Sequence, residues 1–454
     1  MTIIPPTDAP NIVIIAIDTL RPDHLGCYGY RKPTSPEIDA VAAESVVFDA
    51  AFAAAIPTMP AFTTLYTGLH PYRHGIVSHV GERRLSEHIR TLPELAKERG
   101  YITVGIDNLV AQGDGRGSWF ARGYDHYSGY LYRPHGDQDA RLAERALGFI
   151  QEHADTPLFL FLHLWAPHTP YGPQPPYDTL HYEPGSCPYT MEDVRRIHPE
   201  YYDAFVGDMK LQHPEDYAYI VAQYDGEITQ ADAQVGRIVR ALREQGVWDN
   251  TVFVVMSDHG ECFGEGNFHF DHHGLYDAVT RMALMLRLPR RAPERIRALV
   301  SSEDFLPTLA DLVGLPLPQY PLTGTSLVPL IEREAAEVRP YVVSAESTRQ
   351  ASLALRTLDW KLILPITEDA RGEPLPDFYG RPRHPEPVLF DLRADPGEEH
   401  DVSTECPEKL TELMVILETW RREMAAAAGE PDPIQAQGLS LSYPRFMERV
   451  LSRR

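Results

Sequence analysis

The stretch Asn-Ile-Val-Ile-Ile-Ala-Ile-Asp at residues 11–18 decides the fold of this chain. A short run that is apolar at consecutive positions and rich in β-branched residues is typical of a strand buried on both faces of a parallel sheet. Similar runs occur at residues 102–106, 158–164 and 251–256, and helical patterns occur at residues 36–45, 91–99, 139–153 and 217–245. Strands that alternate with helices predict a doubly wound, mostly parallel α/β sheet, in which ligands bind at the carboxyl ends of the strands.

The pattern of predicted helices and strands changes at about residue 340. Short strand patterns at residues 351–357, 360–365 and 387–392 precede a helical pattern at residues 407–427. We therefore expect a large catalytic domain over residues 1–340 and a smaller C-terminal antiparallel α+β domain over residues 341–454. The Pro-, Tyr- and His-rich stretch 171–214 has little periodicity, and it is either a lid or substrate wall or a plain surface excursion.

Composition limits the function classes. The formal net charge of −23 disfavours binding to nucleic acid or to an anionic membrane. The four cysteines form no C-x-x-C pair, and the N-terminal residues show neither a secretory signal nor a transmembrane run, so we expect a cytoplasmic protein. A small anionic substrate would need a local cation to oppose this global charge, and a bound divalent metal would supply it.

Acidic residues follow two of the predicted buried strands. Asp18 ends the first stretch, and Asp258 with His259 follows the strand at 251–256. A carboxylate after an apolar run is costly to bury unless it is paired or ligates a metal, and an adjacent imidazole can join it on one divalent ion. A hydrogen-bonded turn at Asp258 and a helix N-cap at Asp18 are the competing interpretations.

Thr58 stands just before Pro60 in a segment that predicts a helix ending at Gly68. A hydroxyl at a helix N-terminus faces the positive end of the helix dipole, which favours an anionic substrate and a lowered hydroxyl pKa. From this segment alone a simple N-cap is the favoured interpretation of Thr58, and a nucleophile is the alternative.

Together these motifs resemble the sulfatase family of the alkaline phosphatase superfamily. The likeness runs in order along nearly the whole chain, through the segments NIVIIAIDTLRPDHLGCYGYRKPTSPEIDAVAAESVVFDAAFAAA (11–55), TMPAFTTLYTGLHPYRHG (58–75), PHTPY (167–171), SDHGECFGEG (257–266), HHGLYDAVTRMAL (272–284), DFLPTLADLVGLP (304–316), TGTSLVPLI (323–331), RTLDWKLIL (356–364) and LFDLRADPGEEHDV (389–402). The resemblance implies an alkaline-phosphatase-like fold and a hydrolase.

Residue by residue, the resemblance implies a metal held by Asp18, Asp258 and His259, with Thr58 completing the site as nucleophile. His168 of the PHTPY segment would contact the non-bridging oxygens or protonate the leaving group. The remaining candidates implied by their place in these motifs are His272 and His273 as catalytic residues beside the substrate, His163 and His269 as substrate-binding residues, Asp271 near them in sequence, and Phe62 as an apolar wall for an aryl or alkyl group of the substrate. A core-histidine interpretation of His272 and His273 stays open.

The chain departs from sulfatases at the nucleophile, where those enzymes carry C-x-P-x-R or S-x-P-x-R. Threonine cannot be oxidised to formylglycine, because its Cβ bears a methyl group, and Phe62 takes the place of the arginine. The second acid of the sulfatase Asp-Asp pair is Thr19, and His259 stands where many sulfatases have asparagine. These changes resemble the branch with a Thr nucleophile, which includes phosphodiesterases and phosphonate monoester hydrolases.

The departures lead to a functional prediction with two alternatives. We expect cleavage of phosphodiester or phosphonate monoester bonds without formylglycine; the alternatives are direct sulfuric ester hydrolysis by Thr58 and a catalytically decayed pseudoenzyme. One divalent ion is expected, and the mixed carboxylate, hydroxyl and imidazole set suits Mn²⁺ or Zn²⁺ better than Ca²⁺. Asp225 and Asp232 are interpreted as scaffold, and the tail at 431–454 either wraps a neighbouring subunit in a homo-oligomer or frays.

Overall fold

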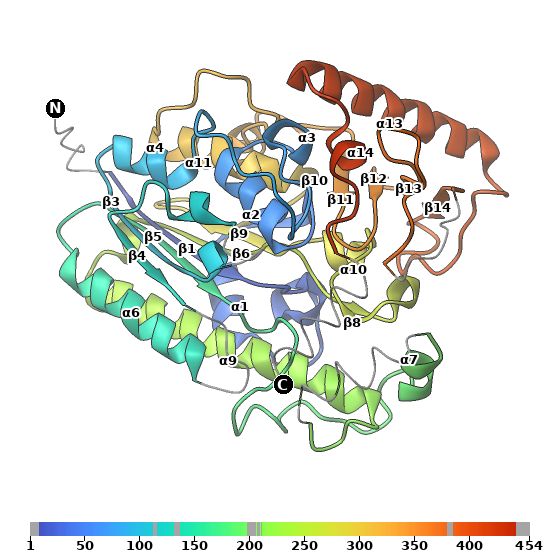
Figure 1. Ribbon diagram of the computed structural model, residues 1–454. Helices are drawn as coiled ribbons and strands as arrows, with labels where there is room; N and C mark the ends of the chain where they lie inside the picture. The colour runs from blue at the N-terminus through green and yellow to red at the C-terminus, as the bar shows by residue number, and fades with distance from the viewer. Residues whose placement is uncertain are drawn as a thin grey trace.

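The computed structural model describes residues 9–111, 116–130, 137–197, 206, 209, 211–378 and 385–441. A central eight-stranded sheet carries helices on both faces, and a separate four-stranded sheet lies beside one end of it (Figure 1). The predicted α/β architecture with a smaller C-terminal antiparallel domain is confirmed.

The central sheet has the order β10-β2-β9-β6-β1-β5-β3-β4. Its strands are β1 (Asn11–Ile17), β2 (Val46–Phe52), β3 (Ile102–Asp107), β4 (His126–Gly129), β5 (Leu158–Leu164), β6 (Thr251–Ser257), β9 (Leu284–Arg287) and β10 (Glu294–Ser301). All neighbouring pairs are parallel except those that β9 makes with β2 and β6. The sequence prediction found the four most apolar strands and missed β2, β4, β9 and β10, which are short or interrupted by charged residues.

Strand β1 lies at the centre of the sheet because it is apolar on both faces. It pairs in parallel with β5 on one side and β6 on the other, with Ile17 opposite Ser257. Every residue of β1 and β6 is buried. The residues that follow them, Asp18 and Asp258, therefore emerge side by side at the carboxyl edge of the sheet.

Helices cover both faces of the sheet (Figure 1). The helices of the large domain are α1 (Pro36–Ala42), α2 (Thr58–Thr67), α3 (Pro71–His74), α4 (Leu92–Glu98), α6 (Gln138–Glu152), α7 (Met191–Ile197), α9 (Tyr217–Glu244), α10 (Asp277–Thr280), α11 (Phe305–Val313) and α12 (Val328–Ile331). Alternate residues of β1 point into two cores: Val13 and Ile15 pack with α6 and α9, whereas Ile12 and Ile14 pack with α2, α4 and α11. This two-sided burial is the physical reason why the strand shows no alternation of polar and apolar residues.

The C-terminal sheet is antiparallel, with the order β11-β12-β13-β14. Its strands are β11 (Val342–Glu346), β12 (Ser352–Arg356), β13 (Trp360–Pro365) and β14 (Val388–Asp391), and helix α13 (Pro407–Ala428) packs against it, followed by α14 (Pro433–Gln437). The sequence analysis predicted the last three strands and α13 but missed β11. A further hairpin, β7 (Cys262–Phe263) with β8 (His269–Asp271), lies between the two sheets near α10 (Figure 1).

Asp225 and Asp232 lie on α9 and serve as buried anchors. Asp225 accepts hydrogen bonds from His24, Tyr30 and Lys32, and Asp232 caps the N-terminus of α1 through two backbone N–H groups. These contacts are those of scaffold residues. The described part of the predicted tail is helix α14 and the residues up to 441, while residues 442–454 lie outside the described residues.

The predicted long loop at 171–214 lies only partly within the described residues. The described part contains a series of turns that pack on α9, followed by α7. Among the helices that the structure describes, none combines the length and apolar character needed to cross a membrane.

Candidate active site

Asp18, Asp258 and His259 form a buried cluster at the carboxyl edge of the central sheet. Asp18 follows β1, and Asp258 and His259 follow the neighbouring strand β6. One potential ligand atom from each side chain lies within 4.8 Å of the others, and none of the three residues is exposed. The structure thus brings together the three residues that the sequence analysis assigned to one metal ion.

Hydrogen bonds orient each of these side chains and leave one atom of each free toward the centre of the cluster. His259 Nδ1 donates to the carbonyl oxygen of Gly260 (3.0 Å), which leaves Nε2 as an acceptor. Asp258 Oδ1 accepts from the backbone N–H groups of Thr19 and His259. Asp18 Oδ1 and Asp258 Oδ2 are buried and have no hydrogen-bond partner among the described residues.

These unsatisfied atoms fit a divalent cation. Two carboxylate oxygens and one imidazole nitrogen are a donor set that Zn²⁺ and Mn²⁺ accept, and buried charges are otherwise costly. Burial raises the pKa of Asp18 to about 6, and burial followed by the charge of Asp18 raises that of Asp258 to about 6. Both raised pKa values follow first from burial, which makes the charged form of each carboxylate costly in the absence of a cation.

Thr58 is the first residue of α2. The residue in the N-cap position is Pro57, so the interpretation of Thr58 as an N-cap is wrong, and the helix begins two residues earlier than Pro60 suggests. Because Thr58 does not cap its own helix, its hydroxyl is available to the cluster: Oγ1 lies 3.5 Å from His259 Nε2. Thr58 is 1% exposed and adjoins the metal-binding atoms.

His163 and Phe62 lie behind Asp18. His163, on β5, places Nε2 3.1 Å from Asp18 Oδ2, and burial lowers its pKa to about 4. A neutral imidazole that donates this hydrogen bond fixes the Asp18 carboxylate. Phe62, on α2, is fully buried, and its ring packs edge-on against His163, with the ring centroids 4.8 Å apart. Both side chains thus support Asp18 from the interior, whereas the sequence analysis placed them against the substrate.

His168 and His272 belong to a row of aromatic rings that leads to His259. The ring centroids of Trp165 and His168 are 4.1 Å apart, those of His168 and His272 4.6 Å, and those of His272 and His259 5.2 Å. His168 Nδ1 donates to the carbonyl oxygen of Thr169, and burial holds the pKa of His168 well below its usual range. A neutral His168 therefore presents Nε2 as a proton acceptor.

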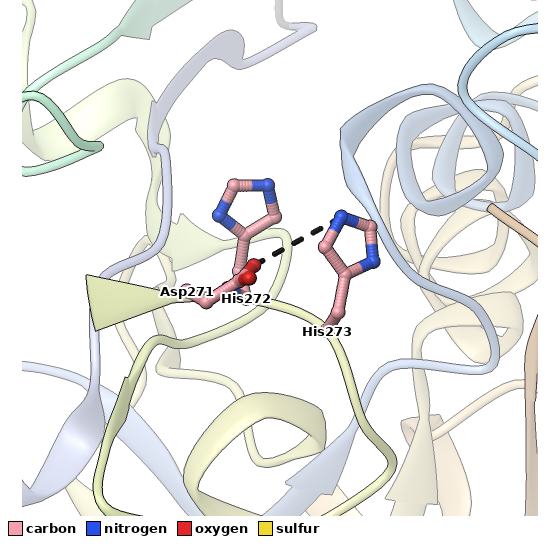
Figure 2. Close-up of side chains that lie close together, drawn as sticks. All are labelled: Asp271, His272 and His273. Carbon is pink, nitrogen blue, oxygen red and sulfur yellow. Dashed lines mark hydrogen bonds and ion pairs between the residues drawn. The ribbon is translucent and has the colours of Figure 1, made fainter. Parts of the chain in front are cut away.

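The other predicted histidines have separate partners. His273 Nδ1 donates to Glu346 Oε1 (2.8 Å), and Asp271 pairs with Arg349, so both are tied to residues of the C-terminal sheet and the turn after β11. Figure 2 shows the carboxylate of Asp271 facing the ring of His273, with the ring of His272 beside them. His269 bonds to Tyr217, and its ring packs edge-on against that of Tyr189.

Sequence reasoning missed four residues near the cluster. Thr19 adopts a left-handed backbone conformation (φ 54°) while its N–H bonds to Asp258. Glu261 is fully buried beside His272, with Oε1 3.5 Å from His272 Nδ1, and its place in the SDHGE segment was a usable signal. Glu346 and Arg349 come from the C-terminal domain, and no local pattern marks them as site residues.

Comparisons with known proteins place the chain among enzymes of one family. A family model described as Sulfatase matches residues 10–315. N-acetylglucosamine-6-O-sulfatase from Bacteroides thetaiotaomicron is 24% identical over 504 residues, which cover 92% of this chain and 87% of that protein.

Two solved structures share the fold at low sequence identity. Phosphonate monoester hydrolase of Agrobacterium radiobacter has a TM-score of 0.75 at 23% identity and covers 91% of this chain and 96% of its own. The phosphonate monoester hydrolase from Silicibacter pomeroyi has a TM-score of 0.72 at 21% identity and covers 91% and 95%. The likeness extends over both sheets.

Proposed function

The chain belongs to the sulfatase family, and from that premise we propose that it is a metal-dependent hydrolase whose nucleophile, Thr58, cleaves phosphodiester or phosphonate monoester bonds. The observation that carries the proposal is the position of the Thr58 hydroxyl. It lies at the N-terminus of α2, 3.5 Å from a ring nitrogen that belongs to a buried Asp-Asp-His cluster.

A divalent metal held by Asp18, Asp258, His259 and Thr58 would lower the pKa of the hydroxyl and oppose the charge of the substrate. The chain's own residues prepare for this chemistry. His163 fixes Asp18, the backbone N–H groups of Thr19 and His259 fix Asp258, and Gly260 fixes the tautomer of His259. Such preorganisation is required because a ligand set that moves by 1 Å loses most of its effect.

The reaction proceeds in two steps. Thr58 Oγ1 attacks phosphorus while its hydroxyl proton passes to a neighbouring histidine, and the bond to the leaving oxygen breaks as the histidine passes that proton to the leaving alcohol. Water then attacks phosphorus while a histidine takes one of its protons, and that proton passes to Thr58 Oγ1 as its bond to phosphorus breaks. His168 suits the second step, because Nδ1 donates to Thr169 and Nε2 is left to accept a proton.

Two features favour phosphoryl over sulfuryl substrates. Thr58 cannot yield the formylglycine aldehyde on which sulfatases rely, and Phe62 replaces the arginine that would help to hold a doubly charged group. A singly charged phosphodiester or phosphonate monoester needs less positive charge in the site. The names of the two structural neighbours, both phosphonate monoester hydrolases, support the same substrate class.

A sulfuric ester hydrolase is the second candidate. The curated relative N-acetylglucosamine-6-O-sulfatase is similar over nearly the whole chain, and sulfate esters share the tetrahedral geometry of phosphate esters. Direct attack by Thr58 on sulfur would then replace the aldehyde chemistry.

The test compares four matched p-nitrophenyl substrates: the sulfate, the phosphate monoester, a phosphodiester and a phosphonate monoester. Purified protein is loaded separately with Mn²⁺, Zn²⁺ and Ca²⁺, and Thr58→Ala is the matched variant. We expect diester or phosphonate turnover to exceed sulfate turnover and to fall at least about 1,000-fold in Thr58→Ala, with the metal content of the variant measured alongside its turnover. Dominant sulfate turnover would favour the second candidate, and inactivity on all four substrates with every metal would favour a pseudoenzyme.

A further inference from the structure

The turn that follows β1 has a strained backbone. Thr19 adopts a φ of 54°, which lies in the left-handed region. This conformation is rare for a β-branched residue and costs free energy unless the surrounding structure enforces it. The side chain gives no compensation, because Thr19 Oγ1 is buried and has no hydrogen-bond partner among the described residues. Contacts of the backbone must therefore hold the turn.

The positions of two predicted metal ligands depend on this turn. Asp18 directly precedes Thr19, and the backbone N–H of Thr19 donates to Asp258 Oδ1 (3.2 Å). The backbone N–H of His259 donates to the same oxygen (2.9 Å), so the two bonds together set the rotation of the carboxylate. A distance of 3.2 Å is at the long end of the range for such bonds, so a small shift of Thr19 would break it.

The hydroxyl of Tyr224 holds this turn from helix α9, which lies beside α6 on one face of the central sheet (Figure 1). It donates to the carbonyl oxygen of Thr19 (2.8 Å) and accepts from the backbone N–H of Arg21 (2.9 Å). One side-chain group therefore bridges the first and third residues of the turn and fixes the peptide units next to the strained residue.

Tyr224 is itself rigidly placed. Its side chain is fully buried, and its ring packs edge-on against the rings of His24, Tyr171 and Phe263, with centroid distances of 5.1, 5.7 and 4.9 Å. Burial raises the pKa of Tyr224 well above its usual range, so the hydroxyl keeps the proton that it donates to Thr19. A fixed and protonated hydroxyl can enforce the conformation of the turn.

Arg21 connects the same hydroxyl to the turn after β6. Its Nη1 donates to the carbonyl oxygen of Glu261 (2.9 Å), two residues beyond His259. The guanidinium is held in place by Asp23 (2.7 Å) and Glu265 (2.8 Å). Because Tyr224 fixes the backbone of Arg21, it is linked to both turns that carry the Asp-Asp-His cluster.

We propose that Tyr224 is a positioning residue of the metal site, which sets the orientation of the Asp258 carboxylate through the backbone of Thr19. The inference deepens the proposed function and rests on it for the bound group, a divalent cation. Tyr224 acts through the backbone of the turn, so loss of its hydroxyl should leave every ligand present but less well aligned. Residues that orient metal ligands in this way contribute to metal affinity.

The test measures the Zn²⁺ affinity of chelator-stripped, full-length protein by competition with a chromophoric chelator. Tyr224→Phe should raise the Kd about 10–100-fold. Tyr101→Phe is the matched control, because it removes a buried hydroxyl that donates to the carbonyl oxygen of Pro10 (3.0 Å), at the opposite end of β1. The control should bind Zn²⁺ as the wild type does. An unchanged Kd in Tyr224→Phe, or an equal loss in the control, overturns the proposal.

A second comparison separates ligand alignment from a general loss of stability. Glycine adopts the left-handed conformation without strain, so the turn should depend less on the hydroxyl when Thr19 is replaced. In a Thr19→Gly background, Tyr224→Phe should weaken Zn²⁺ binding less than about 5-fold. A loss in this background as large as that in the wild-type background overturns the role of the strained turn.

Hydrogen exchange gives a readout that depends on neither metal nor turnover. In metal-free protein, a peptide that covers residues 17–23 should exchange at least about 10-fold faster in Tyr224→Phe than in the wild type, as measured by mass spectrometry. Exchange at the wild-type rate overturns the positioning role. Tight Zn²⁺ binding by the wild type without turnover of any ester would overturn the proposed function and leave the role of Tyr224 standing.

Discussion

Glu227 should control the rate of the reaction although it lies outside the metal cluster. The segment at residues 165–178, which carries His168, is bound to α9: Glu227 Oε1 accepts from the backbone N–H of Gly172 (2.8 Å), and Gln230 accepts from that of Gln174 (3.0 Å). A Cβ at Gly226 would lie 2.4 Å from the carbonyl oxygen of Tyr177, so the segment packs directly on the helix backbone. Glu227→Ala removes the bond nearest to His168.

The size of the effect follows from this single bond. A hydrogen bond to a buried acceptor contributes about 1–3 kcal/mol when its loss leaves the donor unpaired, and about 1.4 kcal/mol corresponds to a factor of ten. We therefore expect Glu227→Ala to lower kcat about 5- to 140-fold through misplacement of His168. Glu227→Gln keeps the accepting oxygen, and burial raises the pKa of Glu227 well above its usual range, so the neutral amide should be close to wild type.

The assay measures kcat and KM on the best p-nitrophenyl substrate, together with metal content and the urea midpoint of each variant. Metal content should not change, because Glu227 contacts the segment and not the ligands. Wild-type kcat in Glu227→Ala, or an equal loss in Glu227→Gln, would refute the positioning role. A loss of metal together with activity would point to a wider structural effect instead.

Three further predictions concern stability. Burial raises the pKa of Asp139 from 3.8 to about 7, so the folded chain keeps a proton that the unfolded chain releases. The unfolding free energy should therefore fall by at most about 4 kcal/mol as the pH rises from about 4 to about 7. Asp139→Asn should flatten this pH dependence, measured by urea unfolding at several pH values, and an unchanged pH dependence would contradict the assignment. Phe62→Ala should lower the unfolding free energy by about 3–5 kcal/mol, because it opens a cavity under His163, whereas a cost below about 1 kcal/mol in urea would show that the ring is not core. Lys361→Ala removes the buried cation shared by the partly buried carboxylate of Asp277 and the buried carboxylate of Glu398 (2.8 and 2.9 Å), and it should cost about 3–5 kcal/mol by the same measurement. A cost below about 1 kcal/mol would show that water or Arg356 takes the place of Lys361.

The sequence predicted the elements whose burial is complete. Strands β1, β5 and β6 are apolar along their length because both of their faces are covered, and this pattern is visible without a structure. Strand β10 reads Glu-Arg-Ile-Arg-Ala-Leu-Val-Ser and lies at the edge of the sheet, so its first half is solvated and charged. Such an edge strand gives neither a continuous apolar run nor a clean alternation.

The candidate site was predictable where it depends on sequence neighbours and strand ends. Asp18 and Asp258 converge because their strands are parallel neighbours, which the position of each acid after an apolar run indicated. The roles of Phe62 and His163 were not predictable, because only the packing shows that they face inward behind Asp18. Glu346 could not be found from sequence, since 73 residues separate it from His273 and the contact depends on how the two sheets pack.

The departures from the sulfatase pattern are best understood as one linked change in charge. Relative to sulfatases, this chain lacks an acid at Thr19 and a cation at Phe62, so one negative and one positive charge are missing together. In the structure both positions have roles that need no charge. The backbone N–H of Thr19 donates to Asp258 and orients it. The ring of Phe62 packs against His163, which donates to Asp18. With two carboxylates and one imidazole the cluster has fewer oxygen ligands than Ca²⁺ requires, and it suits a smaller ion that accepts nitrogen. Loss of the acid and the arginine is therefore consistent with a working site for Zn²⁺ or Mn²⁺, because random decay would not be expected to keep Asp18, Thr58, Asp258 and His259 in one cluster.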